Sequence, residues 1–106
     1  MQAIPLGKIA VATAGTNVPI TLTAAQAALL PPYGLVKKAE VWPDPADTGV
    51  SKVYISGVYV AGLPSPGTTA GGHAQAYEAC HVNPLLISID NSVGGGQGPL
   101  VTLWVE

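Results

Sequence analysis

Short runs rich in valine, isoleucine, leucine, threonine and tyrosine alternate along this chain with turns of glycine and proline. The breaks recur about every eight to twelve residues, which is typical of all-β sandwiches and barrels. We therefore predict one domain over residues 1–106, an all-β, jelly-roll-like β-sandwich. The pattern predicts about eight strands, at Lys8–Thr13, Val18–Thr23, Leu35–Trp42, Val50–Ser56, Val58–Ala61, His73–Val82, Leu85–Asp90 and Pro99–Val105.

One segment favours a short helical turn instead. Residues 24–30 contain four alanines and two leucines, and Thr23 and Gln26 have the spacing of a capping box. Pro31 and Pro32 end any helix at once, because proline cannot continue it. A helix this short needs packing against the rest of the domain to persist.

Three segments are predicted to be loops. Residues 43–49 hold two prolines, two aspartates and a glycine, which are residue types that favour turns. Residues 63–72 and 91–98 are rich in glycine, and the second run lacks the lysine and hydroxyl residue of a phosphate-binding loop. Gly57 is expected to mark a bulge or bend between two strands.

The last strand is apolar on both of its faces. One face carries Val101, Leu103 and Val105, and the other carries Leu100, Thr102 and Trp104. Either this is a central strand whose second face is covered by a loop, or that face is buried against a neighbouring subunit. The pattern alone leaves both interpretations open.

Charge is unusually sparse in this chain. Charged residues make up 9% of the sequence and arginine is absent, whereas an ordinary soluble domain has about 25% charged residues. Because charge normally keeps a small domain soluble and separate, we expect much of the exterior to contact other protein. The net charge of −2 and four lysines also argue against direct nucleic-acid binding.

Few residues in the sequence are candidates for catalysis, and we expect that the protein is not an enzyme and has no cofactor and no metal site. Cys80 and His81 are adjacent, so in a strand they would point to opposite faces; Cys80 is expected to pack as a small apolar group. His73 lies too far along the same strand to share a metal with His81. Asp44 and Asp47 are expected to cap backbone amides in their turn rather than bind calcium.

The stretch 39–49, followed by Val53–Gly57, resembles small structural proteins of tailed-bacteriophage virions. In those proteins a strand leads into an alanine–aspartate–threonine–glycine turn and a short strand that ends in glycine. The turn at 63–67 and the closing strand Val101–Val105 fit the same resemblance. Capsid decoration (cement) proteins are the subtype it favours.

That resemblance implies a virion subunit on the capsid surface, made in the host cytoplasm. Its partners would be the major capsid protein and its own copies, as a homodimer or homotrimer, with no membrane contact. The implied function is to stabilise the icosahedral shell by bridging major capsid proteins. A head–tail or tail structural subunit remains an alternative, as does a carbohydrate-binding β-sandwich module with Trp42, Tyr54 and Tyr59 as its platform.

The expected interface combines the two ends of the chain with one or more of the glycine-rich loops. Residues 1–8 are either an N-terminal arm that lies across a neighbour or an ordinary first edge strand. No basic segment followed by an apolar one begins the sequence, and no apolar run is long enough to span a bilayer. The predicted contact residues are Ile4, Pro5, Leu6, Leu100, Val101, Leu103, Trp104 and Val105.

Overall fold

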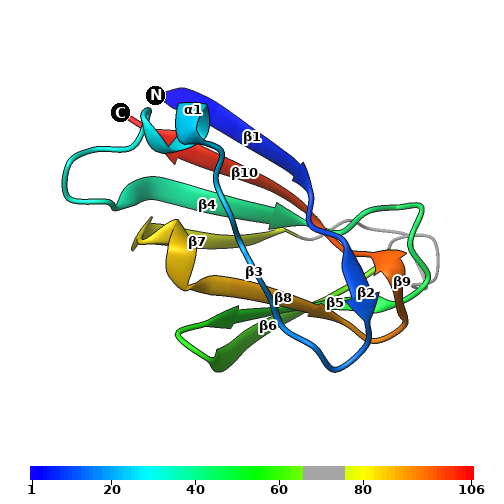
Figure 1. The fold of residues 1–106 in the computed structure, drawn as a ribbon. Coiled ribbons are helices and arrows are strands. Elements are labelled where there is room, and N and C mark those ends of the chain that lie inside the picture. The colour runs from blue at the N-terminus through cyan, green and yellow to red at the C-terminus, as the bar shows by residue number, and fades with distance from the viewer. Residues whose placement is uncertain (66–75) are drawn as a thin grey trace.

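A computed structural model describes residues 1–65 and 76–106 and shows an all-β sandwich of antiparallel sheets (Figure 1). Two four-stranded sheets form its layers, and a two-stranded sheet lies at one end (Figure 1). The first sheet has the order β1 (Gln2–Lys8), β10 (Leu100–Val105), β4 (Val36–Trp42) and β7 (Tyr77–Val82). The second has the order β3 (Val18–Pro19), β8 (Ile87–Asn91), β5 (Val50–Ile55) and β6 (Val58–Pro64), and the small sheet pairs β2 (Val11–Thr13) with β9 (Gly94–Gln97).

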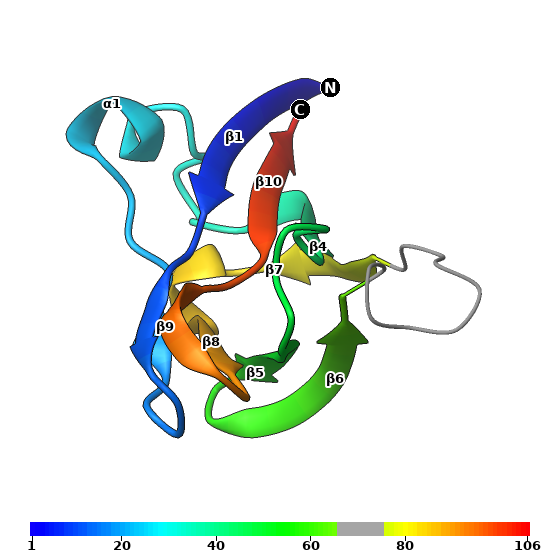
Figure 2. The same ribbon diagram turned by 90° about the vertical axis from the view of Figure 1, so that its right-hand side faces the viewer.

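Figure 2 shows the arrangement of the strands from the side, and the core residues come from both large sheets. Alternation along each strand sends every second side chain inward, where it is removed from water. The first sheet contributes Ile4, Ala39, Val41, Val101, Leu103 and Val105, and the second contributes Val53, Leu63, Ile87 and Ile89.

Two short helices interrupt the strands. The predicted helical turn is confirmed as α1 (Ala24–Ala27), and its capping box forms as expected. The Thr23 hydroxyl accepts the Gln26 amide at 3.1 Å, and the Gln26 side chain accepts the Thr23 amide at 2.9 Å. A 3₁₀ helix, η1 (Pro84–Leu86), follows β7 at the predicted break. Neither helix is long and apolar enough to cross a membrane.

The N-terminal segment is an edge strand and not a free arm. β1 pairs with β10 along its length, from Gln2 opposite Val105 to Lys8 opposite Leu100. Ile4 is buried in the core, which ties the segment to its own domain. The structure therefore favours the edge-strand interpretation over a free arm, because one side of the β1 backbone pairs with β10 and Ile4 packs in the core.

The glycine-rich segment 91–98 contains a strand that the sequence did not predict. β9 pairs with β2, and the glycines allow backbones to approach closely. A Cβ on Gly98 would lie 1.8 Å from the Ile9 carbonyl oxygen, and one on Gly94 would lie 2.6 Å from the Ala14 amide nitrogen. Gly94 and Gly98 are therefore required by packing, and a segment whose composition is typical of a loop contains a paired strand.

Other boundaries differ in detail. Ser56 and Gly57 both have positive φ and form the tight β5–β6 turn, so Gly57 marks a bend, and the bulge lies at Val60. β6 continues to Pro64, past the end predicted for it. The predicted loop 63–72 and the start of the predicted strand at His73 fall partly outside the described residues.

Candidate functional site

The outer face of the first sheet brings two tryptophans together. Leu100, Thr102 and Trp104 of β10 lie directly opposite Trp42, Glu40 and Lys38 of β4, respectively. Directly paired residues point their side chains to the same face of an antiparallel sheet. These six residues therefore form one surface, which we call the tryptophan face.

Glu40 is the centre of this surface. The Trp42 indole Nε1 donates to one carboxylate oxygen of Glu40 at 3.2 Å, and the Trp104 Nε1 donates to the other oxygen. Because each N–H bond lies in the plane of its ring, the two hydrogen bonds limit how the indoles can turn. A pair of fixed aromatic rings results from one shared acceptor.

Lys38 completes the cluster. Its ammonium lies 3.6 Å from a Glu40 oxygen and 5.7 Å from the centre of the Trp104 ring, within reach of a cation–π contact. A third partner, Glu78 of β7, lies 3.9 Å away. Lys38 thus offsets the charge of Glu40, and Glu78 leaves one negative charge at the rim of this face.

The chemistry of this arrangement is that of a contact surface. Both Glu40 oxygens already accept hydrogen bonds, so the carboxylate is committed to the indoles. Trp42 is 41% exposed and Leu100 is 39% exposed, which leaves large apolar groups in contact with water. Rigid aromatic anchors with little net charge are typical of protein–protein interfaces.

No family model, curated protein or solved structure matches this chain. Beyond the tryptophan face, large apolar side chains are also exposed near the β5–β6 turn, where Val58, Tyr59, Leu85 and Leu86 lie.

The structure divides the eight predicted contact residues into two groups. Four are buried in the domain's own core and are unavailable to a partner, which corrects the prediction for Ile4, Val101, Leu103 and Val105. The reason is that β1 and β10 are adjacent strands of one sheet, so their inward faces fill the same core. The other four remain at least partly accessible, namely Pro5, Leu6, Leu100 and Trp104.

Four members of the tryptophan face were not predicted as contact residues: Thr102 of β10 and, on β4, Lys38, Glu40 and Trp42. Alternation along the strand already placed the three β4 residues on one face, and that face was the partly wet one. The missing information was the pairing of β4 with β10, which joins positions 58 to 66 residues apart. Nothing local in either strand encodes that pairing.

The three aromatic residues of the expected sugar platform do not gather in one place. Tyr54 and Tyr59 are cross-strand partners whose rings meet edge to face, with centres 5.6 Å apart. Both belong to the second sheet, whereas Trp42 belongs to the first. The molecule therefore carries two separate aromatic surfaces.

The candidate reactive groups are dispersed. Cys80 is exposed, which corrects the expectation that it packs as a small apolar group. It lies opposite Lys38 at the rim of the tryptophan face. His81 is also exposed, and its backbone has a φ of 51°. His73 lies outside the described residues. Within residues 1–65 and 76–106, no cluster of metal-ligating side chains and no cavity is present.

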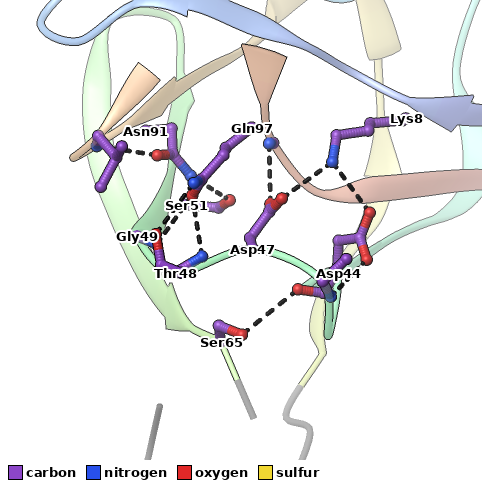
Figure 3. A network of polar contacts seen from close by, with 12 residues as sticks. Lys8, Asp44, Asp47, Thr48, Gly49, Ser51, Ser65, Asn91 and Gln97 are labelled. Atoms are coloured by element: carbon purple, nitrogen blue, oxygen red, sulfur yellow. Dashed lines mark hydrogen bonds and ion pairs between the residues drawn. The ribbon is translucent and has the colours of Figure 1, made fainter. Parts of the chain in front are cut away.

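Asp44 and Asp47 cap backbone amides as predicted, and both also contact Lys8 (Figure 3). Asp44 accepts the Ala46 amide at 2.9 Å, and the buried Asp47 accepts the Gly98 amide at 2.9 Å. The Lys8 ammonium lies 3.0 Å from Asp44 and 2.9 Å from Asp47. This ion-pair cluster fastens the turn after β4 to the end of β1.

Two amide side chains extend the same network (Figure 3). Gln97 accepts the backbone amides of Thr48 and Gly49 at 3.0 and 2.9 Å. The fully buried Asn91 accepts the amides of Val93 and Gly94 and donates to the Ser51 hydroxyl. These contacts hold the loops at one end of the sandwich in place, so we assign the network a structural role.

The ion-pair cluster predicts a specific acid sensitivity. The Ala46 amide and the Lys8 ammonium hold the pKa of Asp44 below its ordinary value of 3.8. A carboxyl with a lowered folded-state pKa contributes stability that is fully present above its ordinary pKa and is lost as pH falls through the folded value. We therefore expect the difference in Tm between the natural chain and Asp44→Asn to be constant above about pH 5 and to shrink towards pH 2.

Thermal melts followed by circular dichroism across that range would measure the effect. A Tm difference that does not change with pH would contradict the assignment. The pKa of Lys8 shifts in the opposite direction, because hydrogen bonds from its ammonium to Asp47 and Asp44 raise it above 10.5. Its contribution is therefore complete below that value and is lost only at higher, strongly alkaline pH.

Proposed function

We propose that this chain is a structural subunit of a bacteriophage virion, a capsid decoration protein that stabilises the icosahedral shell. Its tryptophan face would dock on the major capsid protein, and further contacts would bridge neighbouring capsid subunits. The protein would be made in the host cytoplasm and would act on the capsid surface. The resemblance described above supplies the virion context for this proposal.

The observation that carries the proposal is the exposure of the tryptophan face. A domain with 9% charged residues presents the exposed Trp42 and Leu100 beside the half-buried Trp104 on the outer face of one sheet. Exposed aromatic patches of this kind mark interaction sites. Aromatic side chains also dominate the binding energy of known interfaces.

The sparse charge supports an assembly role independently. A soluble monomer has little reason to keep large apolar side chains on both sheets in water. In a shell, many weak contacts act together because each subunit is tethered at several points. A decoration subunit can therefore tolerate a surface that would be a liability in isolation.

Binding to empty expanded shells of the encoding phage tests the proposal. We expect the purified chain to bind such shells at micromolar concentration and to raise their melting temperature. Trp42→Ala should weaken binding by about thirtyfold, the usual effect of removing an aromatic anchor. Val93→Ala is the matched control, since Val93 is exposed but lies outside the tryptophan face; its effect should be under about twofold.

The outcomes separate the proposal from its alternatives. Shells that show no binding or no gain in melting temperature would contradict the decoration role. Specific binding to tail or portal assemblies instead would favour a head–tail or tail subunit. Saturable binding on a glycan array that is lost in Tyr59→Ala would favour a carbohydrate-binding module.

A further inference from the structure

β6 is an open edge of the second sheet. It pairs with β5 on one side, and no described residue pairs with its other side. Its seven residues, Val58–Pro64, include no charged side chain. Natural proteins usually protect an edge strand with charge, proline, a bulge or short length, because an open edge recruits other strands.

The other edges of the two large sheets are better protected. β1 has Pro5 in its middle and an irregularity before Gly7, and β7 carries Glu78 on an exposed position. β3 is only two residues long and ends in Pro19. β6 has a bulge at Val60, but its pairing with β5 is regular from Ala61 to Pro64.

The direction of the free backbone groups follows from the neighbouring strand. The Val50 amide donates to the Ser92 hydroxyl at 2.8 Å, and the Val50 carbonyl accepts the Ser92 amide at 3.0 Å, so both point away from β6. Backbone groups alternate in direction along an antiparallel strand. The backbone N–H and C=O groups of Ser51 and Val53 therefore point towards β6, where these residues pair with Leu63 and Ala61.

Gly62 consequently points its N–H and C=O away from β5. It lies opposite Lys52, between the hydrogen-bonded pairs Ser51–Leu63 and Val53–Ala61. Pro64 also points outward, but it has no N–H to offer. On the regular part of β6, Gly62 is the residue that presents both a donor and an acceptor to the open edge.

We propose that β6 pairs antiparallel with β6 of a second copy of this chain, with Gly62 opposite the second copy's Gly62. In this register each Gly62 N–H donates to the carbonyl of the second copy's Gly62, so two equivalent hydrogen bonds form about the two-fold axis. A register centred on Ala61 would need the bulged Val60, and one centred on Leu63 would place the proline opposite Gly62.

The side chains also fit a second copy. A two-fold axis pairs β6 with its own copy, so charges of one sign along this edge would repel each other across the contact. β6 has no charge, and Val58, Tyr59 and Val60 are 63%, 54% and 38% exposed. In the Gly62-centred register Val60 of one copy would lie opposite Pro64 of the other, so each exposed Val60 would lose contact with water against the second copy's strand.

The dimer would place both tryptophan faces on the same side. A continuous antiparallel sheet keeps the core faces of both copies on one side, and each first sheet lies across its core. Two docking surfaces pointing in one direction would allow a dimer to bridge two neighbouring shell subunits. This consequence rests on the proposed function, whereas the pairing itself can be measured without any shell.

Sedimentation velocity over a concentration series tests the pairing. We expect a monomer–dimer equilibrium in the natural chain. Gly62→Pro removes the outward N–H without breaking a bond to β5, and proline is tolerated at an edge whose N–H faces solvent. It should weaken dimerisation by about tenfold or more, the effect of two lost hydrogen bonds. Gly62→Ala keeps the N–H and should change it by under about threefold.

Disulfide trapping tests the register in a second way. In a Cys80→Ser background, Gly62→Cys should form a crosslinked dimer on oxidation, because a hydrogen-bonded pair has its Cα atoms about 5.5 Å apart. The nearest atom to a Cβ at this position is the tip of the Tyr59 ring, which can turn aside. Val58→Cys is the control: it is more exposed, yet the two copies of residue 58 would be roughly 20 Å apart.

Several results would overturn the proposal. These are a natural chain that stays monomeric at high micromolar concentration, a dimer unaffected by Gly62→Pro in a folded variant, or crosslinking at residue 58 but not at residue 62. If the chain is monomeric and Gly62→Pro abolishes shell binding, β6 receives a strand of the capsid protein instead. Dimerisation without shell binding would retain the pairing and remove the decoration role.

Discussion

Leu103→Ala is expected to lower the free energy of unfolding by about 3 kcal/mol. Leu103 is fully buried between the two sheets, and its truncation removes apolar contact and leaves a cavity in the core. Leu100 lies on the opposite face of the same strand and is 39% exposed, so Leu100→Ala should cost less than about 1 kcal/mol. Urea unfolding followed by tryptophan fluorescence would measure both values.

The same pair of variants separates core from docking surface. Leu100→Ala should weaken shell binding although it barely changes stability. Leu103→Ala should bind normally at temperatures where it remains folded. Equal losses of stability in the two variants would contradict the assignment of inward and outward faces to β10.

Asn91→Ala is expected to cost about 3 kcal/mol, because it leaves buried amides without an acceptor. The Asn91 side-chain oxygen accepts the Val93 amide at 2.9 Å and the Gly94 amide at 3.2 Å, and the residue has no exposed surface. Differential scanning calorimetry or urea unfolding would measure the loss.

Ser51→Ala is the matched control for Asn91. It removes only the hydrogen bond from the Asn91 amide group to the Ser51 hydroxyl, at 3.2 Å. We expect a loss of about 1 kcal/mol. If Ser51→Ala were as damaging as Asn91→Ala, the two backbone amides would not be the reason for burying an asparagine at this position.

The proposed self-association and the proposed docking surface would together account for the sparse charge. Docking through the tryptophan face would require exposed aromatic rings, and pairing through β6 would require an edge strand without like charges. A conventional charged exterior would interfere with both contacts. The price is a free chain with exposed apolar side chains on both sheets.

Local pattern determined the fold class of this protein. Turn residues at regular intervals and alternating strands predicted the β-sandwich, and the capping box at Thr23 and Gln26 predicted α1. These features depend on neighbours in sequence, where the physical rules act at short range. The same reasoning identified Leu100–Val105 as a strand with two apolar faces.

Tertiary structure alone decided which face of a strand is buried and what lies beside it. Alternation sorts Val101, Leu103 and Val105 from Leu100, Thr102 and Trp104, but both sets are largely apolar, so either could have formed the core. The pairing of β10 with β1 and β4 settled the choice. It also turned four predicted contact residues into core residues.

The sequence by itself therefore determined that this chain folds into a β-sandwich with few charges. Only the folded structure brought Trp42 and Trp104 to one carboxylate, placed Lys8 between Asp44 and Asp47, and left the backbone of Gly62 facing an open edge. These contacts join residues far apart in the chain. Strand order and register, which depend on the packing of the whole domain, set them.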